Sequence, residues 1–301
     1  MNWLAKISIP PSLKLLLSML IFGTIGLFVK ATSLPSGFIA AARGIIGGVI
    51  ILVFILLIKK KPDKASIKNN LIPLLLSGAF IGINWVLLFE SYRYASVAVA
   101  TLCYYMAPVF VVIFTPLVLR VRVSVAGWIC VSLALLGMVL VSSVGLNEGG
   151  NLTGVLLALG AAAFYAAVTF INKKMKEISQ YDTTVVQLLS AALVVLIYSL
   201  ACEHVTAEML DFKSVAVVLL LGVVHTGVAY VLFFGSVKAL ASETVAVLSY
   251  IDPIVAVLLS ALVLGEPTSP RSIIGAVIII ASTLALELVT AKKKPIKNTE
   301  I

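Results

Sequence analysis

Residues 219–264 read LLLGVVHTGVAYVLFFGSVKALASETVAVLSYIDPIVAVLLSALVL, and residues 74–119 read LLLSGAFIGINWVLLFESYRYASVAVATLCYYMAPVFVVIFTPLVL. Placed under each other at a constant offset of 145 residues, the two stretches share identical residues along their length. Matches of Leu or Val are common by chance in so apolar a chain, but matches of Gly, Tyr and Pro are not. Such matches pair Gly82 with Gly227, Tyr105 with Tyr250, and Pro108 with Pro253. The chain therefore contains an internal repeat.

The composition places the chain in a membrane. Hydrophobic residues make up 61% of it, charged residues only 12%, and the mean hydropathy is +1.16. A soluble domain has about 25% charged residues, so this chain cannot cover itself with a water-facing surface. A spanning helix needs about 20 apolar residues. Ten such segments are predicted, at residues 14–33, 35–58, 71–91, 96–118, 124–144, 152–171, 182–202, 213–235, 243–264 and 271–290.

The predicted fold is an all-α membrane protein with ten transmembrane helices arranged as a 5+5 inverted repeat. We expect a first five-helix repeat at 12–144, a second at 152–290, and a basic cytoplasmic tail at 291–301. Because each repeat has an odd number of spans, the second enters the membrane in the opposite orientation. Inverted repeats are typical of secondary transporters, whose substrate site lies near the midplane between the halves.

The basic residues set the orientation of the chain. If the N-terminus is cytoplasmic, 17 Lys and Arg residues fall in inside segments and four in outside segments, with Arg43 alone inside a span. Cytoplasmic loops of membrane proteins carry such an excess. The net charge of +9 is therefore interpreted as a topology signal and not as a nucleic-acid surface. We expect a multi-pass protein of the plasma (inner) membrane with both termini in the cytoplasm.

From about Ser12 to Val289, the chain resembles the EamA-like members of the drug/metabolite transporter superfamily. The resemblance rests on these features: Pro35 with Arg43 early in the second span, Ala107-Pro108, Gly137, the Pro253-centred span followed by Leu264-Gly265-Glu266-Pro267, and Gly275. The first half departs from the pattern at the matching turn, which reads Leu119-Arg120-Val121-Arg122. The resemblance implies a ten-helix bundle that exports or exchanges small metabolites by alternating access. It leaves the substrate open, since the superfamily handles amino acids, nucleotide sugars and drugs.

Two charged residues are predicted within spans, where a charge costs about 2.5–3.5 kcal/mol at a helix centre. Arg43 lies about eight residues into the second span. It either extends to the lipid headgroups or serves as a counter-charge for an anionic substrate group or a gate. Asp252 directly precedes Pro253 and could accept from backbone donors freed by a kink. It is either a proton-coupling or amine-binding carboxylate, or a buried structural acid.

Other polar residues have weaker signals. His225 is either a hydrogen-bonded packing residue or a proton carrier. Asn84 and Gln187 can bridge helices, and Asn84 is alternatively a substrate-binding residue. Glu90 and Arg93 are expected to form a salt bridge at the outer rim. Two further charged residues lie close to span ends and are expected to extend to the membrane surface: Lys30 and Glu287.

Aromatic residues are predicted to line a pocket. Five tyrosines fall at mid-depth, away from the interfacial belt that lipid-facing tyrosines prefer: Tyr104, Tyr105, Tyr165, Tyr230 and Tyr250. We expect a central pocket lined by spans 1–4 and 6–9, with spans 5 and 10 bracing the bundle. Pro108 and Pro253 are expected to kink spans 4 and 9, so that these spans bend as each side opens.

Transport is therefore the predicted function. The favoured form is export of amino acids or similar metabolites, driven by an ion or substrate gradient. The alternatives are an intramembrane enzyme acting on a lipid-linked substrate, and a passive pore or scaffold. An enzyme would need clustered acids, histidines or arginines at one interface, which the sequence lacks; no nucleotide-binding or zinc motif is present either. We expect no enzymatic activity, no cofactor, no metal and no nucleic-acid partner. The expected partners are a small-molecule substrate and the lipid bilayer, and the working unit is a monomer or a homodimer.

Overall fold

The computed structural model describes residues 9–58, 62–147, 151–237 and 239–291. Within those ranges the chain is helical and contains no strand. Nearly all of the predicted basic tail, from residue 292 on, lies outside the described residues.

Ten apolar spans account for the bundle. In the described part of the chain nine helices are long and apolar enough to cross a membrane, and a tenth apolar helix is described over Val125–Val141. The prediction of an all-α, ten-helix membrane fold is confirmed. The first half comprises α1 (Pro11–Gly23), α2 (Ile25–Lys30), α3 (Ser36–Leu57), α4 (Lys64–Asn69), α5 (Leu71–Tyr94), α6 (Val97–Tyr104), α7 (Ala107–Leu119) and α8 (Val125–Asn147). The second half comprises α9 (Leu152–Lys174), α10 (Gln180–Cys202), η2 (Ala207–Leu210), α11 (Phe212–Gly222), η3 (Val223–Val228), α12 (Ala229–Val237), α13 (Ser242–Ser249), α14 (Ile251–Leu262) and α15 (Pro270–Ala291).

Spans 4 and 9 are broken at matching positions of the repeat. Span 4 is interrupted between α6 and α7 at Tyr105, and span 9 between α13 and α14 at Tyr250. Pro108 and Pro253 lie in the first turn of the helix that follows each break. Proline fits there because the first turn of a helix needs no intrahelical N–H bond. Each break therefore precedes its proline by two or three residues.

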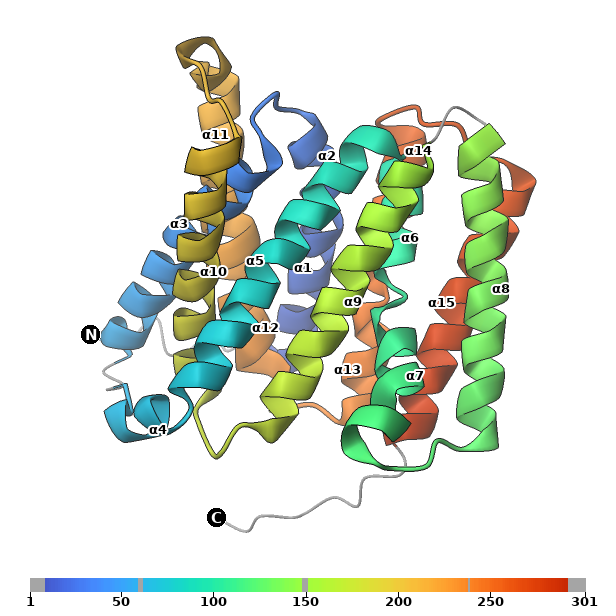
Figure 1. Cartoon of the computed structure of the whole chain (residues 1–301), viewed down its shortest axis with the longest axis horizontal. Helices are drawn as coiled ribbons and strands as arrows, with labels where there is room; N and C mark the ends of the chain where they lie inside the picture. Colours follow the sequence, from blue (N-terminus) through green and yellow to red (C-terminus); the bar gives the residue numbers. More distant parts are fainter. Residues whose placement is uncertain (1–8, 59–61, 148–150, 238, 292–301) are drawn as a thin grey trace.

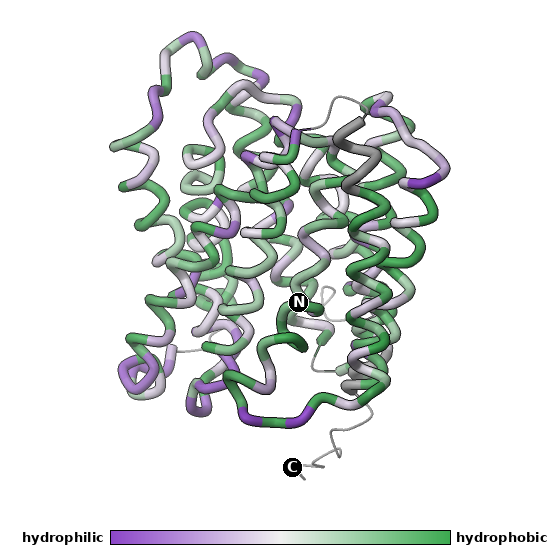
Figure 2. Tube along the Cα trace, turned by 45° about the vertical axis from the view of Figure 1, so that its right-hand side comes forward, coloured by the Kyte–Doolittle hydropathy of each residue, from purple (hydrophilic) through white to green (hydrophobic). Residues whose placement is uncertain are grey.

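The two halves interleave in space. α10 packs against both α3 and α5, and α9 packs along α5, so the second half lies against the first over most of the bundle. α8 and α15 pair with each other along one edge (Figure 1). Hydrophilic segments gather at the two ends of the helices, with a mostly hydrophobic band between them (Figure 2). We call the end that carries α4 the lower face and the end that carries η2 the upper face, as drawn in Figure 1.

The α8–α15 edge is held by a close crossing of two glycines. A Cβ at Gly275 would lie 2.8 Å from the carbonyl oxygen of Gly137, and a Cβ at Gly137 would lie 2.9 Å from the carbonyl oxygen of Gly275. Real Cβ atoms do not come that close to backbone, so only glycine permits this approach. Small residues play this role in many membrane helix pairs.

Gly275→Leu is therefore expected to destabilise the protein by about 1–3 kcal/mol, the usual penalty of overpacking. The measurement is the thermal unfolding midpoint in detergent, followed by size-exclusion chromatography of the heated protein. Gly235→Leu is the matched control, because a Cβ at Gly235 would meet nothing within 4 Å. Equal midpoints for the two variants would contradict the assigned role of this crossing.

Candidate functional site

A central cavity of about 450 Å³ lies between the two halves. Eight of the candidate binding and helix-kink residues predicted from the sequence line it: Arg43, Asn84, Tyr104, Tyr105, Pro108, Tyr165, Tyr230 and Asp252. The lining comes from spans 1–4 and 6–9, as predicted, and in addition Glu287 of span 10 contributes. His225, Tyr250 and Pro253 are not among its lining residues.

Arg43 is held on the cavity wall by aromatic rings. Its side chain comes from the second turn of α3 and is 2% exposed. The guanidinium carbon lies 4.3 Å from the centre of the Trp85 ring and 5.3 Å from that of Phe89. Its Nε donates to Oγ1 of Thr226, at 3.0 Å. The interpretation that Arg43 extends to the headgroups is wrong, because the side chain is buried.

The charge of Arg43 has no protein counter-charge in the described part of the chain, where the salt bridges join other residues. Cation–π contacts supply about 0.5–2 kcal/mol each, which holds the guanidinium without neutralising it. Trp85 and Phe89 were not predicted as site residues. Their spacing of four residues puts them on one face of α5, but the spacing does not show whether that face points to lipid or to a cavity.

Asp252 brings a negative charge from the other half. Its Oδ2 accepts from the hydroxyl of Tyr105, at 2.8 Å, and that hydroxyl also lies 3.3 Å from the backbone oxygen of Ser249. The partner is thus a side chain of the first half, and not the freed backbone donors expected from the sequence. Asp252 lies in the first turn of α14, where the helix dipole favours a negative charge.

The tyrosines form a connected aromatic wall. Ring centres lie 5.8 Å apart for Tyr104 and Tyr165, 6.2 Å for Tyr104 and Tyr105, and 5.8 Å for Tyr105 and Tyr250. Tyr165 is 48% exposed and lines both this cavity and a neighbouring one. Tyr230 packs edge-on against Phe22, at 5.5 Å. The expectation that mid-depth tyrosines face protein or a cavity is met by all five.

His225 lies behind the cavity wall. It belongs to η3, a π-helical segment that adds a residue to the turn and faces α1 and α3. Its Nε2 is 2.7 Å from Oγ1 of Thr24, and its ring packs edge-on against Phe28. With 2% of its surface exposed, His225 has the contacts of a packing residue.

Polar side chains line the part of the cavity that extends toward the lower face. Nε2 of Gln187 donates to Oγ of Ser77, at 2.7 Å, and to Oδ1 of Asn172, at 2.8 Å. Asn84 donates to the backbone oxygen of Ala161. Both amides thus bridge helices, as predicted, and Gln187, Asn172 and Asn84 also line the cavity.

At the upper face, polar contacts connect the two halves. Glu266, in the turn after α14, pairs with Lys30 of α2, accepts from Ser260, and accepts from the backbone N–H of Val97, at 2.8 Å. Lys30 is exposed at this face, as expected of a residue near a span end, and it also forms an ion pair there. Val97 begins α6, so a carboxylate of the second half caps a helix of the first.

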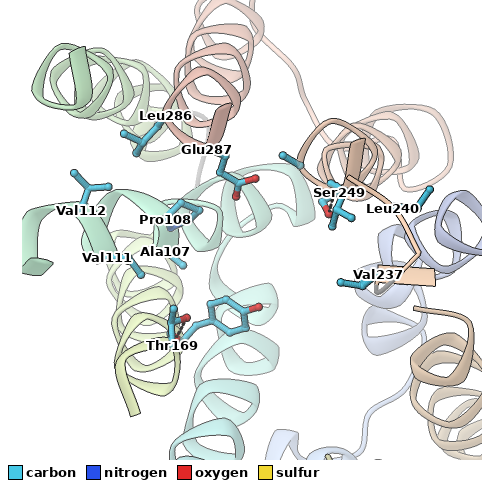
Figure 3. Close-up of a pocket in the computed structure, with 13 residues that line it drawn as sticks. Ala107, Pro108, Val111, Val112, Thr169, Val237, Leu240, Ser249, Leu286 and Glu287 are labelled. Carbon is cyan, nitrogen blue, oxygen red and sulfur yellow. Dashed lines mark hydrogen bonds between the residues drawn. The ribbon is translucent and has the colours of Figure 1, made fainter. Parts of the chain in front are cut away.

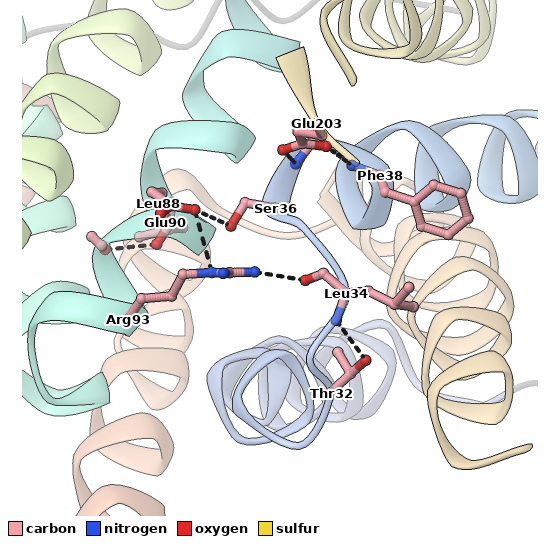
Figure 4. A network of polar contacts seen from close by, with 10 residues as sticks. Thr32, Leu34, Ser36, Phe38, Leu88, Glu90, Arg93 and Glu203 are labelled. Atoms are coloured by element: carbon pink, nitrogen blue, oxygen red, sulfur yellow. Dashed lines mark hydrogen bonds and ion pairs between the residues drawn. The ribbon is translucent and has the colours of Figure 1, made fainter. Parts of the chain in front are cut away.

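A second carboxylate caps another helix across the halves (Figure 4). Glu203, which follows α10, accepts from the backbone N–H groups of Gly37 and Phe38, at 2.8 and 2.9 Å, where α3 begins. Nearby, Nε of Arg93 lies 3.3 Å from Oε2 of Glu90, which confirms the predicted rim salt bridge. Figure 4 also shows Arg93 bonded to the backbone oxygen of Leu34.

Comparisons with known proteins show the family and the fold of the chain. Residues 10–143 and 152–287 each match the EamA-like transporter family. The chain is 32% identical over 289 residues to a Bacillus subtilis protein named uncharacterized transporter YxxF, covering 94% of this chain and 90% of that protein. It is 28% identical to uncharacterized transporter YwfM of the same organism, with 90% of each chain covered. A crystal structure of 18% identity covers 95% of this chain and 99% of its own, with a TM-score of 0.64, and so has the same fold.

Both five-helix halves match one family, the relatives that cover most of the chain are named transporters, and a central cavity lies between the halves. The chain is a multi-pass membrane transporter and belongs to the EamA-like transporter family.

Proposed function

We propose that the protein is a secondary active transporter of the plasma membrane that exports small zwitterionic metabolites, such as amino acids, by alternating access. The observation that carries this proposal is the pair Arg43 and Asp252 on one cavity. One residue comes from each half, their charges are opposite, and neither forms an ion pair in the described residues.

A zwitterion meets both charges at once. Its carboxylate fits Arg43, which is well suited to planar carboxylate recognition, and its ammonium group fits Asp252. Each unpaired charge within a span costs about 2.5–3.5 kcal/mol at the helix centre, and a bound substrate of opposite charge reduces this cost. The cavity of about 450 Å³ falls in the range of small-molecule sites, and its aromatic walls suit an organic side chain.

Alternating access requires that the halves move against each other around the site. The broken spans 4 and 9 meet the cavity at Tyr105 and Asp252, where a bend displaces the binding groups. The contacts of Glu266 and Glu203 close the upper end, while the cavity extends toward Asn172 and Gln180 at the lower face. We infer that the structure is the state closed at the upper face.

The same proposal assigns the lower face to the cytoplasm. The described Lys and Arg residues of that face outnumber those of the upper face. The lower face carries Lys64, Lys68, Arg120, Arg122, Lys173, Lys174 and Lys176, and the upper face carries Lys30, Arg93, Lys213 and Arg271. Lower-face loops rich in basic residues stay in the cytoplasm.

A fluorescent protein fused after Ile301 is accordingly expected to fluoresce, and alkaline phosphatase fused at the same place to be inactive. Both reporters are compared at equal abundance in bacterial cells. Active phosphatase with a dark fluorescent protein would reverse the proposed orientation.

The transport site is tested with Arg43→Gln and Asp252→Asn. Mass spectrometry of culture medium first names the compounds exported by the wild-type protein, and counterflow of radiolabelled amino acids into proteoliposomes gives the rates. Each variant is expected to lose at least about tenfold in rate, because a hydrogen bond to a charged group contributes about 1.5–3 kcal/mol.

Lys213→Gln is the control for that experiment, since it removes one charge from the exposed upper face. Full rates in both site variants would refute the site while leaving the transporter class intact. Failure of the wild-type protein to exchange any amino acid or other zwitterion would refute the substrate class.

Closure at the upper face is tested with Glu266→Gln, which removes the ion pair with Lys30. A lost pair of about 1 kcal/mol shifts the conformational equilibrium about fivefold toward the state open at that face. The readout is the rate at which Thr101→Cys, a cavity-lining position, reacts with an impermeant maleimide added outside, in a background without native cysteines. Arg271→Gln is the control, and an unchanged or slower reaction in Glu266→Gln would contradict the assigned role.

A further inference from the structure

A side cavity of about 440 Å³ opens beside the central one, near the lower face (Figure 3). Its wall is mostly apolar, with Val111, Val112, Val237 and Leu240 among the lining residues. Glu287 of α15 is the one charged side chain among the described residues that line it. The mechanism proposed above does not use this carboxylate.

Glu287 lies where the two cavities meet. Six residues line both of them: Ala107, Pro108, Tyr165, Thr169, Ser249 and Glu287. In Figure 3 the Glu287 carboxylate points into the space between Pro108 and Ser249, away from its own helix. The expectation that Glu287 extends to the membrane surface is therefore wrong. Glu287 lies near the end of its helix, but its orientation around the helix axis directs the side chain toward the cavities.

The surroundings of Glu287 select for positive charge. In the part of the chain that the structure describes, it forms no salt bridge. A carboxylate among apolar side chains is costly unless a cation or a proton accompanies it. When Glu287 is ionised, a ligand with a positive end is therefore favoured at this place, and one with a negative end is repelled.

Glu287 and Asp252 both line the central cavity, and Ser249 lies between the two cavities with Glu287. Ser249 lines the shared region, and its backbone oxygen lies 3.3 Å from the Tyr105 hydroxyl, which donates to Asp252 at 2.8 Å. Two carboxylates thus face one continuous space, Glu287 at the junction with the side cavity and Asp252 beside Tyr105. The same cationic group is suited to both carboxylates in turn.

We propose that Glu287 forms an inner subsite that takes the primary ammonium group of the substrate on its way from the lower face to Asp252. This subsite rests on the proposed function in that it assumes an amine-bearing substrate. It adds a second cation-binding position, and it makes span 10 part of the transport path and not only a brace.

The test uses Thr169→Cys as a reporter in the full-length protein without its native cysteines, that is with Cys103→Ala, Cys130→Ala and Cys202→Ala. Thr169 lines both cavities. Two measurements are made in lipid nanodiscs. The first is the ratio of reaction rates with cationic and anionic methanethiosulfonate reagents. The second is protection of the cysteine from neutral N-ethylmaleimide by n-butylammonium, with butyrate as the anionic counterpart.

With Glu287 present, we expect the cationic reagent to be preferred and n-butylammonium, but not butyrate, to protect. Glu287→Gln is expected to lower the rate ratio at least about threefold and to abolish protection. Glu287→Asp, which keeps the charge, is expected to retain both effects. Glu177→Gln removes an exposed carboxylate near the same face and is expected to change neither.

A rate ratio and protection that do not depend on Glu287 would overturn the inference, as would equal effects of Glu177→Gln. These measurements require no transport. Failure of the proposed function, seen as absent counterflow of zwitterions, is therefore distinguishable from failure of the inner subsite.

Discussion

Everything in this structure depends on the need to satisfy backbone hydrogen bonds without water. In the hydrocarbon region an unpaired N–H or C=O group costs several kcal/mol, so irregular backbone is tolerated only where it is buried in protein or lines a cavity. The interruptions at Thr24, Tyr105 and Tyr250 follow this rule. A residue at or beside each interruption lines the central cavity. These residues are Gly23 and Ile25 beside Thr24, Tyr105 itself, and Ser249 and Asp252 close to Tyr250. The breaks in the helices and the place of the site thus have one cause.

Charges obey the same constraint. At the upper face, where water is near, Lys30 and Glu266 form an ion pair, and Glu203 accepts hydrogen bonds from the N-terminus of α3. Within the membrane, Arg43 rests against Trp85 and Phe89, and Asp252 against Tyr105. Rings and a hydroxyl hold these two charges in place without cancelling them. The interior therefore keeps its charges available to a ligand, whereas the upper face uses its charges to join the halves.

Much of this could be predicted from the sequence, and the limits have a physical origin. Apolar segments of about 20 residues predicted the ten spans, and the matched prolines predicted that spans 4 and 9 are not straight. The free-energy cost of a charge within a span indicated that Arg43 and Asp252 are candidate site residues. Helix rotation could not be predicted, because α5 and α8 are apolar nearly all round and give no preferred face. For that reason Trp85 of α5 was missed. Glu287 of α15 was assigned to the membrane surface because it lies close to the end of its span. The Lys30–Glu266 pair joins residues 236 positions apart, and no local pattern in one sequence shows such a contact.

The repeat makes the scaffold symmetric, but the charges on it are not. At the same offset of 145 residues, Arg43 corresponds to Leu188 and Asp252 corresponds to Ala107. All four residues line the central cavity. Symmetry thus brings two equivalent pairs of positions to one space, and in each pair only one position is charged. A substrate with two opposite charges then fits in a single orientation, whereas a fully symmetric site would accept two. In the proposed function, the two halves supply the movement, and the charged residues in which they differ select the substrate.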